Sequence, residues 1–216
     1  MKKKLALALA FASLGILGAA KSADATVILS FGQNGNVNTI TGTNNGAGVT
    51  TIAGSNIAVT ITQIDAGVAT PIAAFLTLSA TSTGAASTDG SGQITQHYMG
   101  SFSIVNGGTN YLSGTFTDFV AGQGTGLTLS SATPDAVTFT SNVIAASELN
   151  LPRAIALGLA NVSPAVSVVA GSISSFTSSI SGTFSATPTA VPEPISLLLM
   201  GAGLAAVGIR ARRQKA

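Results

Sequence analysis

The sequence predicts an all-β fold, an antiparallel β-sandwich or barrel-like domain that occupies residues 26–187. The first observation is a series of runs in which apolar and polar residues alternate with a period of two, as in strands with one buried face. The second is the set of Gly-, Asn- and Pro-containing clusters between these runs, which are typical of turns. The third is an abundance of Thr, Val and Ile, which are β-branched residues and are favoured on strands.

The alternating runs place the strands along the chain. In the run 56–64, Ile57, Val59 and Ile61 share one face. The stretch 172–186 closes the domain as one long strand or as a strand pair. Four further runs alternate in the same way, at 94–105, 111–120, 126–131 and 136–144. Turn clusters lie among them at 106–110 and 133–135.

Two stretches fit both a strand and a helix. The stretch 71–80 is apolar enough for a buried strand or a short helix, and Thr77 favours the strand. The stretch 147–162 has enough Ala and Leu for a helical turn, but Pro152 and Gly158 weaken a helix there. We therefore expect mostly strand in both stretches.

Charge is concentrated at the two ends of this 216-residue chain, whose net charge is +2. Between residues 26 and 190, Arg153 is the one Lys or Arg. The acidic residues of that segment are Asp65, Asp89, Asp118, Asp135 and Glu148. A nucleic-acid partner is excluded for this segment, because such proteins need clustered cations. The chain has no cysteine, which excludes disulfides and thiolate metal sites, and a domain of this length buries enough core to fold without either.

The N-terminus has the pattern of a Sec-type signal peptide over residues 1–25. Three lysines precede an apolar run over residues 5–20, and Ala23-Asp24-Ala25 follows as the small-x-small pattern that signal peptidase accepts. We expect cleavage after Ala25. An uncleaved N-terminal membrane anchor is the alternative.

The C-terminus combines a linker at 188–194, a single transmembrane helix at 195–209 and a cytoplasmic tail at 210–216. A helix of this length is about 22 Å long, shorter than the roughly 30 Å hydrocarbon core of a bilayer. Basic side chains beyond it extend its reach by snorkelling to the interface. They also hold the tail in the cytoplasm, so that everything upstream lies outside. The basic residues of this stop-transfer tail are Arg210, Arg212, Arg213 and Lys215.

The Pro192-Glu193-Pro194 motif, the short apolar helix after it and the Arg-rich end resemble the PEP-CTERM sorting signal of Gram-negative bacteria. This resemblance implies recognition by exosortase, a membrane transpeptidase-like cysteine protease. It also implies cleavage near Pro-Glu-Pro and release to the cell surface or the extracellular matrix, so that the three motif residues are substrate rather than catalyst. A plain tail anchor with a chance Pro-Glu-Pro is the alternative.

Little in the middle segment offers catalytic chemistry. His97 is the single histidine and no Gly-x-Ser-x-Gly motif is present, so we expect a strand histidine beside Tyr98. The Gly-rich stretch 122–127 lacks the Lys and the following helix of a phosphate-binding loop and predicts a turn.

The stretch 87–94 contains the Asp-Gly-Ser-Gly-x-Ile pattern of calcium loops. With Gly92 at the sharp-turn position, Asp89 becomes the third-position ligand, but the twelfth position is Tyr98 where a bidentate Glu is needed. We expect a hairpin turn, with weak calcium binding near Asp89 left open. A glycosidase needs two converging acids and aromatic sugar platforms, and the chain has no Trp.

These observations predict an exported, non-enzymatic protein with no cofactor, metal or catalytic residue. We expect a transient anchor in the inner membrane, processing by signal peptidase and exosortase, and a structural or adhesive role at the cell surface or in the exopolysaccharide matrix of a biofilm. A carbohydrate- or ice-binding module, with extracellular polysaccharide as partner, is the alternative, although Thr60-Ile61-Thr62 and Thr138-Phe139-Thr140 form no regular rows. A secreted hydrolase is the third hypothesis.

Overall fold

The computed structural model describes residues 25–188, except residues 36, 38 and 131–136. These residues lie in one compact unit. The strands are β1 (Thr26–Gln33), β2 (Ile40–Asn44), β3 (Thr50–Ile64), β4 (Ile72–Ser82), β5 (Ser87–Thr88), β6 (Ile94–Asn106), β7 (Thr109–Gln123), β8 (Gly126–Ser130), β9 (Asn150–Ser163), β10 (Val168–Val169), β11 (Ser172–Ile173) and β12 (Phe176–Thr187). One 3₁₀ turn, η2 (Ala146–Glu148), precedes β9. The all-β prediction is confirmed.

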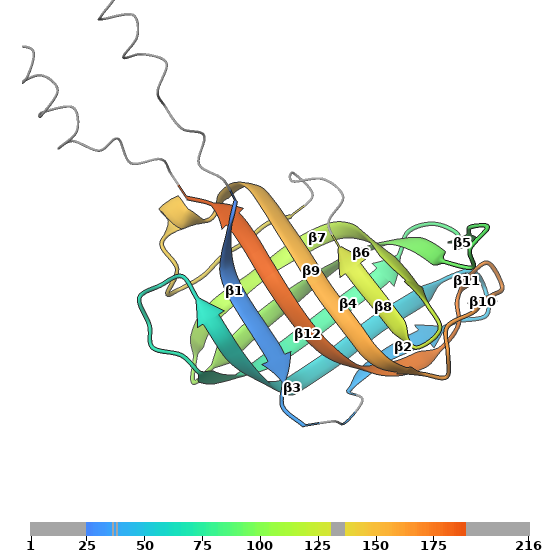
Figure 1. Ribbon diagram of the computed structural model, residues 1–216, viewed down its shortest axis with the longest axis horizontal. Helices are drawn as coiled ribbons and strands as arrows, with labels where there is room; N and C mark the ends of the chain where they lie inside the picture. The colour runs from blue at the N-terminus through green and yellow to red at the C-terminus, as the bar shows by residue number, and fades with distance from the viewer. Residues whose placement is uncertain (1–24, 36, 38, 131–136, 189–216) are drawn as a thin grey trace, which may run out of the picture. The chain divides into compact units, whose positions relative to one another are not determined.

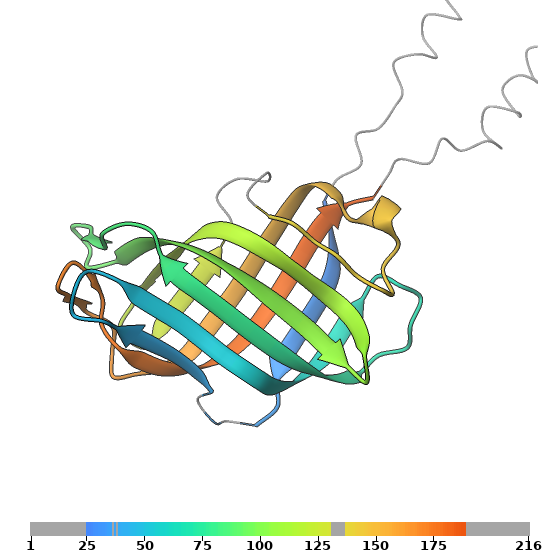
Figure 2. The same cartoon turned by 180° about the vertical axis from the view of Figure 1, so that it is seen from behind.

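The main sheet closes on itself. Antiparallel neighbours run from β3 through β4, β6, β7, β8 and β9 to β12. Strand β12 then pairs with both β1 and β2, and each of these pairs with β3. Figures 1 and 2 show the result as two layers whose strands cross steeply, with β8, β9, β12 and β1 in one and β3, β4, β6 and β7 in the other.

Alternation along the strands fills the space between the layers with apolar side chains. In β4, every second residue from Ala74 to Ala80 is buried, and the residues between them are exposed. Aromatic rings join the layers at the centre, since Phe102 of β6 stacks on Phe184 of β12 with ring centroids 4.6 Å apart. Phe139 packs edge-on against both rings. The core is therefore continuous from one layer to the other, as the alternation predicts.

The predicted strand at 136–144 is reduced to two isolated bridges, Phe116–Val137 and Ser113–Thr140. The burial pattern there is strand-like, with Val137 and Phe139 buried. The ladder fails because the N–H of Thr115 donates to the side-chain Oγ1 of Thr138 at 2.9 Å rather than to a main-chain carbonyl.

The close approach of this segment to β7 depends on Gly114. A Cβ atom at that position would lie 1.8 Å from the carbonyl oxygen of Thr138, so only glycine fits. The segment therefore lies along the part of β7 that the shorter strand β8 does not reach.

The ambiguous stretches are strands. The stretch 71–80 forms β4, and 147–162 forms β9 after the short 3₁₀ turn. The stretch 172–186 is divided between β11 and β12. Strand β1 was not predicted, because Ile28 and Leu29 are consecutive buried residues at an irregularity in the pairing and break the alternation. Strand β2 was not predicted either, although its five residues alternate between buried and exposed positions.

The predictions for the two ends fall almost wholly outside the described residues. This applies to the signal peptide up to Asp24, to the Pro-Glu-Pro motif, to the helix at 195–209 and to the basic tail. Within the described residues, no helix has the length and apolar character needed to cross a membrane.

Candidate functional site

The outer face of β4, β6 and β7 carries Ser and Thr side chains in register. Strand pairing aligns Ser79 with Ser101 and Ser101 with Thr115. Neighbouring strands lie about 4.8 Å apart, and successive outward residues on one strand about 6.7 Å apart, so the hydroxyls form a grid. We call this surface the hydroxyl face; its members are Thr77, Ser79, Thr81, Ser101, Ser103, Ser113, Thr115 and Thr117.

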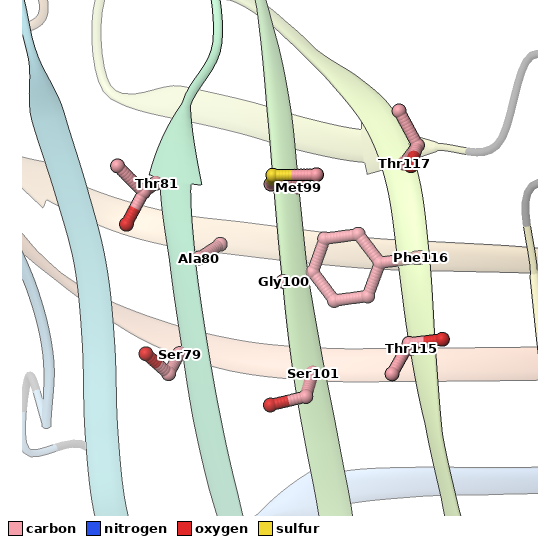
Figure 3. A pocket seen from close by; sticks show the side chains of 9 residues that line it. All are labelled: Ser79, Ala80, Thr81, Met99, Gly100, Ser101, Thr115, Phe116 and Thr117. Carbon is pink, nitrogen blue, oxygen red and sulfur yellow. The ribbon is translucent and has the colours of Figure 1, made fainter.

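A shallow hollow of about 460 Å³ lies in the hydroxyl face (Figure 3). Its floor is formed by Ala80, Gly100 and Phe116, which are cross-strand neighbours. A Cβ atom on Gly100 would lie 2.3 Å from the carbonyl oxygen of Ser79, so a side chain has no room at this point. The ring of Phe116 lies beside this glycine, an arrangement that compensates for the missing side chain.

The hydroxyls of this face differ in their hydrogen bonding. At the β7 edge they are used internally, since Thr115 Oγ1 pairs with Thr138 Oγ1 at 2.7 Å and Ser113 Oγ pairs with Thr140 Oγ1 at 2.8 Å. Four others are exposed and make no side-chain hydrogen bond to any residue that the structure describes: Ser79, Thr81, Ser101 and Thr117. Figure 3 shows these four side chains around the hollow, where each hydroxyl offers a donor and an acceptor.

Large apolar side chains flank the hydroxyls at both ends. Phe75 and Val105 pair across β4 and β6 and are 40% and 37% exposed. Met99 lies between Thr81 and Thr117 and is 54% exposed. None of the nine residues that line the hollow is charged. The surface therefore offers hydroxyls and apolar contacts without formal charge.

A second group of hydroxyls is buried at the end of the sheet where β3 begins. Ser172 of the β10–β11 hairpin pairs with Thr50 Oγ1 at 2.6 Å and with both ends of the Gln96 amide. Gln96 Oε1 also accepts from the N–H of Ile173 at 3.0 Å and from the hydroxyl of Tyr98 at 3.1 Å. We call Thr50, Gln96, Tyr98 and Ser172 the buried polar cluster. It fixes the hairpin to the end of the sheet.

Each member of the buried polar cluster is at most 1% exposed. Burial raises the pKa of the Tyr98 phenol far above its ordinary range, so the side chain stays neutral. The cluster has the properties of a satisfied structural network, because its members hydrogen-bond to one another and to the main chain.

The turn that contains Asp89 forms as predicted, between β5 and β6. One carboxylate oxygen, Oδ1, accepts from the N–H and the hydroxyl of Ser91 at 2.9 and 2.7 Å and from the N–H of Gln93 at 2.9 Å. These bonds, the Ser91 hydroxyl first, hold the pKa of Asp89 below its ordinary value. The carboxylate therefore stabilises its own turn, as in an Asx-turn.

The candidate acids are not gathered into one site among the described residues. Asp65 follows β3, Asp89 precedes β6 and Glu148 lies in η2. Asp135 and the side chain of Asp118 fall outside the described part. No group of three or more His, Asp and Glu side chains that the structure describes is placed to hold a metal ion.

The other sequence candidates have ordinary positions. His97 is exposed on the outer side of β6, one position before the buried Tyr98. The Gly-rich stretch 122–127 contains the β7–β8 hairpin turn, as predicted.

Sequence reasoning missed the hydroxyl face. Thr-x-Thr repeats along one strand are a signal that the sequence shows directly, whereas the regularity of this face lies across strands. The residues that meet there, Ser79, Ser101 and Thr115, are far apart in the chain and come together through the register of β4, β6 and β7. The spacing of outward Ser and Thr in each run was a signal, but it needed the strand order to be interpreted.

Comparison with known proteins identifies the C-terminal segment. Residues 190–213 match the family model described as the PEP-CTERM protein-sorting motif. Pro192, Glu193 and Pro194 fall inside the matched segment, and so do Arg210, Arg212 and Arg213. The motif implies exosortase-dependent sorting of an exported protein that passes through the membrane. Neither the comparison with curated proteins nor that with solved structures found a match.

Proposed function

From the PEP-CTERM motif at the end of the chain, we propose that this protein is a non-catalytic β-domain delivered by exosortase to the cell surface or the exopolysaccharide matrix, where it has a structural or adhesive role. The observation that carries the proposal is the motif at residues 190–213. The tail is the substrate of the sorting protease, and the domain is its cargo.

The domain supports a non-catalytic role through the way its polar groups are used. Asp89 is engaged by its own turn, and the buried polar cluster is satisfied internally. General acid–base catalysis needs a group that is placed to exchange a proton with a substrate. These polar groups instead hold turns and hairpins in place.

The proposed delivery is tested by replacing Pro192, Glu193 and Pro194 together with alanine. The apolar run and the basic tail are unchanged, so the insertion free energy stays nearly the same. We expect the unprocessed variant to accumulate in the inner membrane.

The matched control replaces Thr189 and Val191 with alanine, which changes neighbouring residues and leaves Pro-Glu-Pro intact. This control should be processed and exported like the wild type. If the triple variant reaches the extracellular fraction with the wild-type amount and mass, sorting through this motif is ruled out.

A further inference from the structure

Part of the hydroxyl face is exposed and is not used in the internal hydrogen bonding of the described residues. Ser79, Thr81, Ser101 and Thr117 have exposed hydroxyls that make no side-chain hydrogen bond within the described residues. An exposed hydroxyl without a protein partner binds water, and a ligand can displace that water if it supplies equivalent hydrogen bonds. A partner can therefore bind these four hydroxyls without breaking any side-chain hydrogen bond that they make within the described residues.

The chemistry of the face indicates a neutral, hydroxyl-rich partner. A Ser or Thr hydroxyl both donates and accepts, and so does a sugar hydroxyl, so the two can pair in either direction. The nine lining residues carry no charge that would attract an ionic polymer or fix a phosphate. An anionic or a cationic partner would lack its counter-charge here.

The apolar residues fit the same partner. Phe75, at 40% exposure, presents part of its ring at one end of the face, and Met99, at 54%, lies at the other end. Sugar rings have apolar C–H faces as well as hydroxyl edges, and aromatic and thioether side chains contact such surfaces favourably. From Phe75 to Thr81 the face extends about 20 Å along β4, which is long enough for an extended chain of several sugars.

The shape excludes the main competing ligands. A small molecule is normally enclosed by a deep, mostly apolar pocket, whereas this hollow is shallow and lined mainly by exposed Ser and Thr. A protein partner normally anchors on buried Trp, Tyr or Arg clusters, and none of these residue types lines the hollow. A polymer lying across the strands fits both observations.

We propose that the hydroxyl face, with Phe75, Val105 and Met99, binds a neutral polysaccharide. The inference rests on the proposed delivery of the domain to the outside, where such a polymer is the material to be held. The hydroxyls of Ser79, Thr81, Ser101 and Thr117 would hydrogen-bond to sugar hydroxyls, and the apolar residues at the ends of the face would contact sugar rings.

The test is affinity electrophoresis of purified residues 26–188, the segment whose described residues form one compact unit, in native gels that contain dextran or hydroxyethyl cellulose. Gels with alginate or chitosan provide the anionic and cationic comparisons. We expect retardation by at least one neutral polymer and none by the charged ones.

Two variants locate the binding surface. Phe75→Thr with Met99→Thr removes the apolar contacts, and Thr81→Val with Thr117→Val removes two hydroxyls while keeping the β-branched shape. Each double variant should weaken the apparent affinity at least fivefold. The control Thr128→Val changes an exposed Thr in the second shallow hollow, formed by β8, β9 and β12, and should retain wild-type affinity.

Several results would overturn the proposal. One is a folded wild-type domain that no neutral polymer retards, and another is equal weakening by the control. Preference for alginate or chitosan, inhibition of ice recrystallisation in place of polymer binding, or a dimer that the face variants dissolve would assign the face to another partner. Because the test uses purified domain, its failure leaves the sorting proposal untouched, and the Pro-Glu-Pro variant tests that proposal separately in cells.

Discussion

The buried polar cluster and the hydroxyl face use the same chemical groups in opposite ways. Inside, the hydroxyl of Ser172 bonds to Thr50 and to Gln96, and all three side chains are buried. Outside, Ser79 and Ser101 are exposed and make no side-chain hydrogen bond within the described residues. A hydroxyl in the first setting contributes to stability, whereas one in the second contributes little to stability and remains available for recognition.

The difference also indicates how each region responds to substitution. Removing one member of a buried network leaves its partners unpaired in a low-dielectric interior, which costs the full desolvation penalty of those groups. Removing an exposed hydroxyl only returns a water molecule to solvent. Four changes, in order of decreasing expected effect, test this comparison.

Gln96→Leu should have the largest effect. The amide contacts Ser172 Oγ, the N–H of Ile173 and the hydroxyl of Tyr98, and leucine satisfies none of them. We expect the free energy of unfolding to fall by about 3 kcal/mol, as measured by urea denaturation. The exposed neighbour Gln93 provides the control, because Gln93→Leu should change stability by less than about 0.5 kcal/mol. Equal effects of the two changes would show that the cluster is not structural.

Ser172→Ala should have an intermediate effect. It leaves Thr50 and the Gln96 amide with fewer partners but keeps the Gln96 bond to Ile173. We expect a loss of about 1–2 kcal/mol, and a double-mutant cycle with Gln96→Leu should show less than additive loss because the two side chains share bonds. Strict additivity would contradict a shared network.

The carboxylate of Asp89 is exposed, like the hydroxyl face, but it is hydrogen-bonded within the protein, like the buried polar cluster. It therefore combines features of the two regions. Hydrogen bonds from Ser91 and Gln93 lower its folded pKa below the ordinary value of 3.8. The stabilising contribution is therefore present above that value and is lost as pH falls through the lowered folded pKa. The melting temperature should fall more between pH 7 and pH 3 for the wild type than for Asp89→Asn, whose side chain does not titrate. Equal falls would mean that the turn bonds do not favour the charged form.

Thr81→Val with Thr117→Val should have the smallest effect on folding. Both side chains are exposed, and valine keeps the β-branched shape that strands favour. The free energy of unfolding should change by less than about 0.5 kcal/mol. A loss above about 1.5 kcal/mol would mean that these hydroxyls are structural and would remove the contrast between the two regions.

The sequence was sufficient to place most strands, because alternation records which side chains are buried. The runs 56–64, 94–105 and 111–120 lie inside β3, β6 and β7 for that reason. It was not sufficient where the main chain departs from a regular ladder. Ile28 and Leu29 are both buried at an irregularity in β1, so no alternating pattern marks that strand.

Of the two candidate sites, one could be predicted from the sequence and the other could not. The sorting motif was predictable, because exosortase recognises a short contiguous segment, and the Pro-Glu-Pro residues stand together in the chain. The hydroxyl face was not, because Ser79, Ser101 and Thr115 become neighbours only through strand order and register. Local patterns contain no information on which strands pair or where the sheet closes.

The proposed delivery of the domain to the outside of the cell is tested most directly by the intact mass of the extracellular protein. Cleavage after Ala25 and near Pro-Glu-Pro predicts a chain that begins at Thr26 and lacks Arg210 to Ala216. A single species of that mass is the expected result. An extracellular protein that retains the complete basic tail would contradict the account.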